Sequence, residues 1–321
     1  MMIVPEKSAA IIRDTLSNFV DRTTNGGKMD KNAFTPTPIT ELYEAVMTDL
    51  KSSSLRDQID LLNYKDHLDM SCYAAVDFCP THPLEYQVMV AHLTIFFFHA
   101  DDLLDTKPDA LRYLQLNICT GQPLGDPVLE WYVHEIMPRL WKTFHPTVAS
   151  MIVTACYDFI NGVGIEGLTV GQEVKPQAPK YPDWLRFKTG LSPMYGLLVV
   201  VCATDPQLPT GGIEKYVHVI PDVIIFTNIV NDVLSFYKEM LAEETGNYID
   251  QRAQREQCDI LTALQKVANE GIAAGERVLA GLANAPEYRN NFSVFAKGIV
   301  HFHTAIPRYR LQSLYGMSEG S

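Results

Sequence analysis

The chain has 321 residues, of which 47 % are hydrophobic and 20 % are charged, and its 26 basic and 38 acidic side chains give a formal net charge of −12. This is the composition of a globular protein, large enough for one big domain or two small ones, and no break in composition favours two. We expect a single domain over 1–321, with 1–38 as an N-terminal segment and loop and 310–321 as a short C-terminal tail. An acidic chain without a basic stripe is a poor nucleic-acid binder, so this class is excluded.

The hydrophobic pattern predicts an all-α fold. Apolar residues recur at three- and four-residue steps, and convincing strand alternation is absent. In chain order we expect helices over 39–51, 83–104, 126–144, 146–161, 184–203, 213–241, 258–283 and 287–309. Stretches rich in proline, glycine and polar residues at 23–38, 169–182 and 204–212 are expected to be loops between these helices.

Cysteine usage and apolar run length bear on the location of the protein. The six cysteines are scattered without a Cys-x-x-Cys pair, which indicates buried free thiols in a cytoplasmic protein. They are Cys72, Cys79, Cys119, Cys156, Cys202 and Cys258. Uninterrupted apolar runs fall short of the roughly 18 to 20 residues that a membrane span needs. The first seven residues have neither the charged start nor the apolar core of a signal peptide.

The helix expected over 83–104 ends in a cluster of carboxylates, Asp101, Asp102 and Asp105. Residues four apart on a helix lie one turn above each other, so Asp101 and Asp105 share a face, while Asp102 sits about 100° round. Mg²⁺ prefers oxygen ligands and often bridges a few carboxylates to phosphate oxygens. The cluster therefore predicts a metal site, and a solvated acidic helix end is the alternative.

A second set of oxygen-bearing side chains lies in the helix expected over 213–241. Asn231, Ser235 and Glu239 are spaced i, i+4, i+8, and they drift by only about 80° round a helix. An amide oxygen, a hydroxyl and a carboxylate give a metal site of low formal charge, which leaves room for an anionic ligand. Asp232 points away from this stripe, and we expect it to cap or to pair elsewhere.

These two segments resemble the metal-binding motifs of class I terpene synthases. The second motif, with Phe236-Tyr237-Lys238 inside it, is most similar to the trichodiene synthase branch of fungal sesquiterpene synthases. The resemblance continues in the segments 181–186 (YPDWLR) and 308–311 (RYRL), and it spans about 85–315. The order and spacing of four separate motifs make the resemblance specific.

The resemblance implies a helical bundle that encloses a central apolar active-site cavity. It implies that Asp101 and Asp105 bind Mg²⁺ on one helix and that Asn231, Ser235 and Glu239 bind it on the facing helix. Three Mg²⁺ ions and a prenyl diphosphate, with farnesyl diphosphate favoured, would complete the site and release pyrophosphate. Because the chain is acidic, binding of such a polyanion requires cations to mediate it.

The resemblance also assigns residues to the diphosphate. Arg186 matches the arginine that senses it, with Thr189 and Gly190 at the linker and effector positions that follow. The groups that hydrogen-bond the diphosphate when the pocket closes are matched by Lys238, Arg308 and Tyr309. Ionisation of an allylic diphosphate makes a carbocation and an anion, so the site must stabilise the leaving group while it excludes water.

Aromatic side chains are candidates for the pocket wall, because a π face attracts a carbocation without acting as a nucleophile. Phe97 and Phe98 stand one turn before the first motif, and further candidates are Phe226, Tyr73, Tyr195 and Phe302. For each of them ordinary core packing is the alternative.

Two other patterns have less specific interpretations. The segment 162–167 (GVGIEG) fits the dinucleotide-binding pattern, but an amphipathic helix precedes it where that pattern needs a strand. We expect its glycines, such as Gly164, to kink a helix or to let it approach the pocket closely. His99 is expected to be a packed or supporting residue rather than a metal ligand.

Competing functions are open at this point. A chain-elongating prenyl diphosphate synthase would have a second aspartate-rich motif where this chain has Asn231, Ser235 and Glu239. A non-catalytic scaffold of the same fold would lose the ligands, which are all present here. Related enzymes make cyclic hydrocarbons or acyclic alcohols of the linalool and nerolidol type, also from geranyl diphosphate, and the motifs do not distinguish them. The oligomeric state is open as well, with a homodimer among the options.

Overall fold

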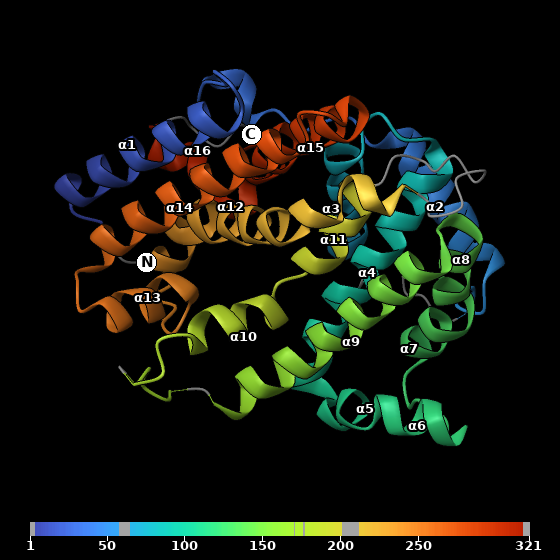
Figure 1. The fold of residues 1–321 in the computed structure, drawn as a ribbon. Coiled ribbons are helices and arrows are strands. Elements are labelled where there is room, and N and C mark those ends of the chain that lie inside the picture. Colours follow the sequence, from blue (N-terminus) through green and yellow to red (C-terminus); the bar gives the residue numbers. More distant parts are fainter. Residues whose placement is uncertain (1–3, 58–64, 170, 176, 201–211, 317–321) are drawn as a thin grey trace.

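The computed structural model of the chain describes residues 4–57, 65–169, 171–175, 177–200 and 212–316. Over these residues it consists of helices and their connections, which confirms the all-α prediction (Figure 1). The longer helices are α1 (Glu6–Thr23), α2 (Thr40–Ser52), α3 (Lys65–Phe78), α4 (Leu84–Thr106), α9 (Pro146–Leu168), α10 (Tyr181–Thr189), α11 (Ser192–Val200), α12 (Ile220–Leu241), α13 (Tyr248–Glu256), α14 (Ile260–Gly281) and α15 (Pro286–Ala305). The shorter ones are η1 (Lys31–Phe34), α5 (Pro108–Arg112), α6 (Leu114–Thr120), α7 (Pro127–Trp131), η2 (Tyr132–Ile136), α8 (Met137–Thr143), η3 (Ile213–Lys215), η4 (Val217–Val219), η5 (Pro307–Tyr309) and α16 (Leu311–Leu314).

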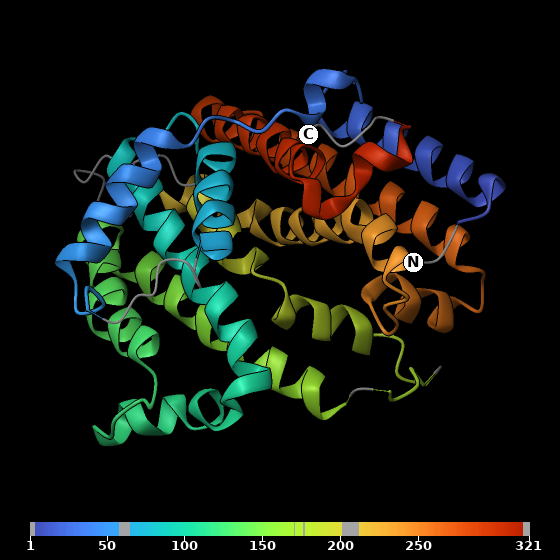
Figure 2. The same cartoon turned by 180° about the vertical axis from the view of Figure 1, so that it is seen from behind.

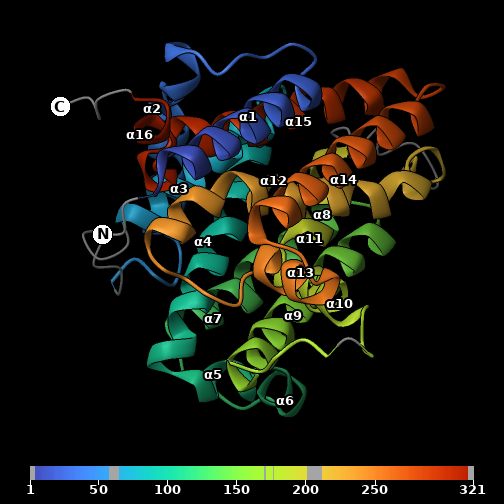
Figure 3. The same cartoon turned by 90° about the vertical axis from the view of Figure 1, so that its left-hand side faces the viewer.

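Helix α12 lies at the centre of the bundle. It packs against α11, α14 and α15, and most of its residues are buried, although it carries a stripe of polar side chains that includes Asn231 and Ser235. Seen from the side, α1, α14 and α15 lie on one side of the molecule, and α5, α6, α9 and α10 lie on the opposite side (Figure 3). This arrangement places the polar stripe of α12 inside the protein.

The two ends of the described chain are joined. The Tyr315 hydroxyl hydrogen-bonds the Ser17 hydroxyl at 2.8 Å and donates to the Arg13 carbonyl at 3.2 Å. Arg13 in turn donates from Nη1 to the Leu314 carbonyl at 3.3 Å. Helix α16 therefore rests on α1, as Figure 2 shows from behind.

Several helices differ from the sequence-based expectation. Helix α9 runs on to Leu168, so the glycine-rich segment is helical and the dinucleotide-loop alternative is excluded. The helix expected over 184–203 is two helices, α10 and α11, with Gly190 and Leu191 between them; 201–203 lie outside the described residues, as does most of the loop expected over 204–212. The run over 126–144 is helical throughout, but η2 in its middle is a π-helix.

Helices α1, α3 and α13 lie outside the expected helical segments. The apolar face of α1 is visible in the sequence, because Ile12, Leu16 and Phe19 recur at four- and three-residue steps and are fully buried. Helix α13 has no such face. It is polar and is held by ion pairs, which periodicity does not reveal.

Two stretches, Pro146–Leu168 and Val217–Leu241, are long and apolar enough to cross a membrane by length and composition. Uninterrupted apolar runs predicted no stretch of this length. The two stretches appear when hydropathy is averaged along the helix, because an average is little affected by isolated polar residues. The second stretch, 78 % buried, contains the central helix α12 and the first belongs to α9. Core helices of a bundle have the same composition, so a membrane span is not indicated.

Among the described cysteines no disulfide occurs, and Cys202 lies outside the described residues. Cys72, Cys79 and Cys156 are buried free thiols, whereas Cys119 is exposed. Burial raises the pKa of Cys72 and of Cys156 to about 12, so both remain unreactive thiols at neutral pH.

Candidate active site

A cavity of about 240 Å³ lies among α3, α4, α9, α10, α11, α12 and α15. Residues from both predicted metal motifs line it, Asp101 from α4 and Asn231 from α12. Arg186 from α10 and Tyr309 from η5 line it as well. The structure thus brings together residues from all four motifs, which are far apart in the sequence.

The first motif ends α4 at one edge of the cavity. Asp101 is exposed, yet desolvation by the surrounding protein and repulsion by the Asp102 carboxylate raise its pKa. Asp102 faces outward to His67, with 3.4 Å between its Oδ2 and the His67 Nε2. Asp105 is exposed and lies outside the cavity wall, although its charge also raises the pKa of Asp101.

His99 lies two residues before this motif and faces away from the cavity. Its Nε2 donates to Asp126 Oδ1 at 2.8 Å, and both side chains are buried. Asp126 also accepts the Val128 N–H at the start of α7. Burial alone would raise the pKa of Asp126, but the bonds from His99 and the backbone outweigh it and lower this pKa to about 2. His99 is therefore a supporting residue, as its sequence context predicts.

The second motif forms one stripe along α12. The Ser235 hydroxyl donates to Glu239 Oε1 at 2.5 Å, and Lys238 Nζ lies 3.7 Å from the same oxygen. Burial raises the pKa of Glu239, and the bond from Ser235 partly offsets this effect. Asn231, one turn earlier, reaches the cavity wall. The predicted order of amide, hydroxyl and carboxylate is thus present in space.

Arg186 connects α10 to the second motif. Its Nε donates to Asp232 Oδ2 at 3.0 Å, its Nη2 lies 2.8 Å from Asp232 Oδ1, and Nη2 also donates to Asn231 Oδ1 at 3.1 Å. Burial alone would lower the pKa of Arg186, but the ion pair with Asp232 outweighs it and the pKa is raised. Asp232 does pair elsewhere, as expected, and its partner is the arginine matched to the diphosphate sensor.

The end of α10 is fixed by close packing. A Cβ on Gly190 would lie 1.9 Å from Asn228 Oδ1 and 2.9 Å from the Arg186 carbonyl oxygen, so only glycine fits. The Asn228 oxygen also accepts the Ser192 hydroxyl at the start of α11. On the other side, a Cβ on Gly162 of α9 would lie 2.8 Å from the Lys188 carbonyl carbon. Gly162 therefore allows α9 to approach α10 closely. The expectation for Gly164 is not met, because a Cβ there would meet nothing within 4 Å.

The C-terminal segment contributes Tyr309 and Arg308. Tyr309 is buried, and its ring centroid lies 4.5 Å from that of His303. Arg308 is exposed, and its charge partly offsets the rise in the pKa of Asp101. His303 is buried in the cavity wall, and this burial lowers its pKa to about 4, so its ring is neutral.

Aromatic rings form much of the cavity wall. Phe97 meets Phe159 edge-on at 5.0 Å between centroids, and Phe98, Tyr195 and Phe302 also line the space. Thr189 and Gly190 line it beside them. Among the aromatic candidates, Tyr73 and Phe226 do not line it.

The pocket position proposed for Phe226 is therefore corrected. Its ring lies 5.2 Å from that of Phe292 and beside Gly275, on the face of α12 that packs against α14 and α15. Helical spacing already indicates this, because at about 100° per residue Phe226 lies about 140° round α12 from Asn231 and about 180° from Ser235.

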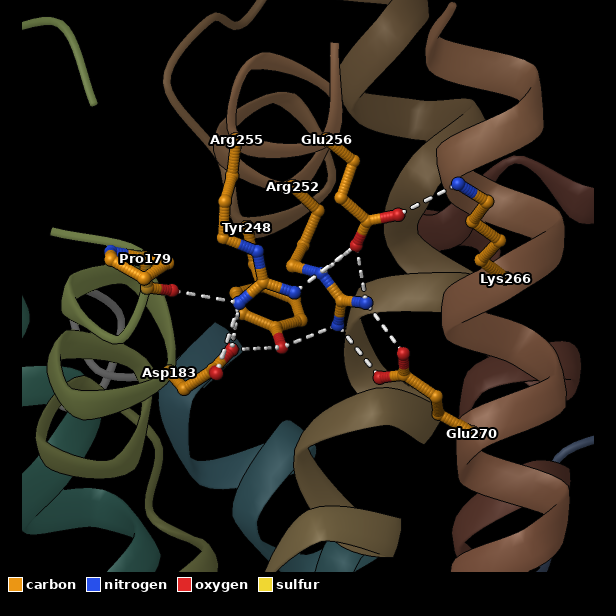
Figure 4. Close-up of polar contacts among 8 residues, drawn as sticks. All are labelled: Pro179, Asp183, Tyr248, Arg252, Arg255, Glu256, Lys266 and Glu270. Atoms are coloured by element: carbon orange, nitrogen blue, oxygen red, sulfur yellow. Dashed lines mark hydrogen bonds and ion pairs between the residues drawn. The ribbon is translucent and has the colours of Figure 1, made fainter. Parts of the chain in front are cut away.

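A polar cluster anchors α10 from outside the cavity. We call it the Arg252–Arg255 cluster; Figure 4 shows its members, Pro179, Asp183, Tyr248, Arg252, Arg255, Glu256, Lys266 and Glu270. Arg255 Nη1 donates to both oxygens of Asp183 at 3.0 Å, and the Tyr248 hydroxyl donates to Asp183 at 2.9 Å. Arg252 is paired with Glu270 on α14. Since Asp183 lies one turn before Arg186, the cluster holds the helix that positions the arginine.

Sequence reasoning missed several polar residues of the site. Asn228 and His303 line the cavity, and Asp183 anchors α10. Glu166 on α9 is exposed but close enough for Arg186 to lower its pKa, although desolvation raises that pKa overall. Two of these residues carried a signal in the sequence. Asn228 lies one turn before Asn231 on the same helix, and Asp183 lies inside the segment 181–186.

The donors suit a hard divalent cation, since they are oxygens of carboxylate, amide and hydroxyl groups. Within the described residues no group of three His, Cys, Asp or Glu side chains gathers into a metal cage. An ion at either motif would therefore need oxygens from a bound ligand in addition to those of the protein, as is usual for Mg²⁺.

Comparisons with known proteins agree with this geometry. A family model described as trichodiene synthase (TRI5) matches residues 67–321. The terpene synthase BipA of Cochliobolus sativus is 28 % identical over 257 residues, which cover 79 % of this chain and 77 % of that protein. The alpha-cuprenene synthase COP6 of Coprinopsis cinerea is 30 % identical over 236 residues, which cover 73 % of this chain and 70 % of that protein.

Solved structures share the fold. The linalool/nerolidol synthase of Streptomyces clavuligerus superposes with a TM-score of 0.63 at 13 % identity, covering 84 % of this chain and 96 % of that one. Its complex with 2-fluorogeranyl diphosphate superposes with a TM-score of 0.59 at 14 % identity, covering 84 % and 95 %. With the family match over most of its length, the chain belongs to the trichodiene synthase (TRI5) family and is a class I terpene synthase.

Proposed function

We propose that this terpene synthase uses Mg²⁺ to ionise a prenyl diphosphate, with farnesyl diphosphate as the favoured substrate, and releases pyrophosphate and a sesquiterpene. The observation that carries the proposal is the cavity itself. A carboxylate, Asp101, an amide oxygen, Asn231, and a guanidinium, Arg186, line it together with a wall of aromatic rings. Family membership suggests divalent metal dependence, and the oxygen donors fit that expectation.

The side chains divide into those for the metal and those for the diphosphate. Asp101 and Asp105 on α4, and Asn231, Ser235 and Glu239 on α12, would hold three Mg²⁺ ions. When bound, these ions would neutralise the charge that develops on the departing pyrophosphate.

Arg186 carries a fork of N–H donors that matches two phosphate oxygens, and Lys238, Arg308 and Tyr309 would add further donors. Arg186 now donates a hydrogen bond to the Asn231 side-chain oxygen. We propose that it gives up this bond and donates to the diphosphate when the substrate and metal bind. The aromatic wall around Phe97 and Phe302 would exclude water and offer π faces to the cation.

Incubations with two substrates, each with and without available metal, test the proposal. Purified protein with farnesyl or geranyl diphosphate, with Mg²⁺ or with EDTA, is followed by gas chromatography with mass detection. We expect volatile products with Mg²⁺ and none with EDTA. The products should be lost in Asn231→Ala and kept in the control Asn161→Ala, since Asn161 is an exposed asparagine on α9. No product from either substrate, or product in the presence of EDTA, would refute the proposal.

An acyclic alcohol of the linalool or nerolidol type is the second candidate product. Thr189, Ser192 and Thr227 line the cavity, and a hydroxyl oxygen among them would accept a hydrogen bond from a water molecule near the cation. The same chromatograms separate alcohols from cyclic hydrocarbons. A non-catalytic scaffold would bind neither Mg²⁺ nor pyrophosphate in a calorimetric titration. The buried free thiols at Cys72, Cys79 and Cys156 support a cytoplasmic location for the enzyme.

A further inference from the structure

His303 lies where α15 faces α12, with 2 % of its surface exposed, and none of the sequence motifs includes it. Its Nδ1 is 2.7 Å from the Ile299 carbonyl oxygen one turn earlier on α15. A carbonyl oxygen only accepts, so Nδ1 carries the proton and donates it. In the neutral ring Nε2 is then a bare acceptor.

That acceptor meets the side-chain amide of Asn231. The distance between His303 Nε2 and Asn231 Nδ2 is 3.1 Å, and an amide NH₂ only donates. At the other end of the same amide, Asn231 Oδ1 is 3.1 Å from Arg186 Nη2, which also only donates. The two neighbours thus require opposite ends of the amide. A 180° flip would place the Asn231 NH₂ group against the Arg186 donor and the Asn231 oxygen against the His303 Nε2 acceptor.

We propose that His303 is a positioning residue that fixes the amide of Asn231 with its oxygen toward the metal side and its NH₂ group toward α15. The inference rests on the proposed function, in which Asn231 is a metal ligand. An amide binds a hard cation only through its oxygen, and a freely flipping amide would present its NH₂ group to the ion part of the time. Partners that orient a ligand in this way typically account for about 10- to 100-fold in metal affinity.

A double-mutant cycle tests the coupling, with the variants His303→Phe, Asn231→Ala and the pair of them. Phenylalanine keeps a buried ring but offers no acceptor. The readout is the affinity for Mg²⁺ plus pyrophosphate by calorimetry, which needs no turnover. We expect His303→Phe to weaken binding by about 10- to 100-fold when Asn231 is present and to have little effect when Asn231 is already alanine. Equal losses in both backgrounds, or no loss at all, would refute the inference.

Binding by the unmodified protein distinguishes failure of the role of His303 from failure of the proposed function. If the unmodified protein does not bind Mg²⁺ plus pyrophosphate, the proposed function fails. If it binds and His303→Phe binds equally well, only the role of His303 fails. His301→Phe is the matched control, since His301 faces Asp77 and the Thr35 carbonyl rather than the cavity.

Should His303→Phe not fold, the tautomer is measured directly. In ¹⁵N-histidine-labelled protein, one ring should show a protonated Nδ1 and an unprotonated Nε2, and Asn231→Ala should shift that Nε2 signal. An Nε2-protonated ring, or an Nε2 signal that ignores Asn231→Ala, would refute the inference.

Discussion

The close approach of α9 to α10 gives the sharpest prediction, because two glycines in one helix serve as test and control. A Cβ added at Gly162 would lie 2.8 Å from the Lys188 carbonyl carbon and 2.9 Å from the Thr189 nitrogen. These are backbone atoms, which cannot rotate away, so α10 would have to move. Two residues further on, a Cβ added at Gly164 would meet nothing within 4 Å.

The magnitudes follow from two opposing effects. Alanine in a helix interior is more stable than glycine by about 1 kcal/mol, and this gain applies to both variants. Overpacking costs about 1–3 kcal/mol and applies to Gly162→Ala alone. Gly164→Ala should therefore be more stable than the parent protein by about 1 kcal/mol, and Gly162→Ala should lie about 1–3 kcal/mol below Gly164→Ala.

Urea unfolding followed by circular dichroism measures both free energies, provided that the slope m is unchanged. Turnover of the same preparations should fall in Gly162→Ala, because α10 carries Arg186 and Thr189, and it should persist in Gly164→Ala. If both variants gained the same stability and kept full activity, the close contact would have no role in placing α10.

Other perturbations address the cluster, the buried carboxylate and the cavity wall. Asp183→Ala should lower the free energy of unfolding in urea by about 1.5–3 kcal/mol and raise KM, because it removes a charged acceptor that anchors α10. Lys266→Ala at the exposed rim of the cluster should lower it by less than about 1 kcal/mol, and equal losses would argue against an anchor. Asp126 has its pKa lowered from 3.8 to about 2. Its charged form therefore stabilises the fold by about 2 kcal/mol at pH values above the unfolded-state pKa. The difference in unfolding free energy between the parent protein and Asp126→Asn should narrow as the pH falls from the unfolded-state pKa toward 2, and a constant difference would contradict the assignment. Phe97→Leu should change the product profile, whereas Phe226→Leu should only lower stability, by about 1 kcal/mol; the reverse pattern in the chromatograms would place the wrong ring in the cavity.

The parts of the site that could be predicted are those that a single helix encodes. Asn231, Ser235 and Glu239 share a stripe because helical spacing alone puts them there, and Asp232 turns away for the same reason. The resemblance to a known family then supplied Arg186, whose position depends on a different helix. Its contact with Asn231 agrees with that assignment.

The parts that could not be predicted are contacts between helices. The pair of Arg186 with Asp232 and the pair of His303 with Asn231 join residues 46 and 72 positions apart. Local periodicity does not say which helix meets each face of α12, although helical spacing does put Phe226 on the side opposite Ser235. Helix α13 could not be predicted from apolar periodicity either, because it is polar and its ion pairs with α10 and α14 form only in the folded bundle.

The contact between α1 and α16 has a consequence for the order of folding. Ser17 and Tyr315 are 298 positions apart, yet their hydroxyls are 2.8 Å from each other. During synthesis α1 emerges long before this partner, and such non-local contacts form slowly. Tyr309 enters the cavity wall from the segment that leads into this contact. The cavity wall is therefore completed only when α16 docks on α1, so chains without this contact would carry both predicted metal motifs beside an incomplete cavity wall.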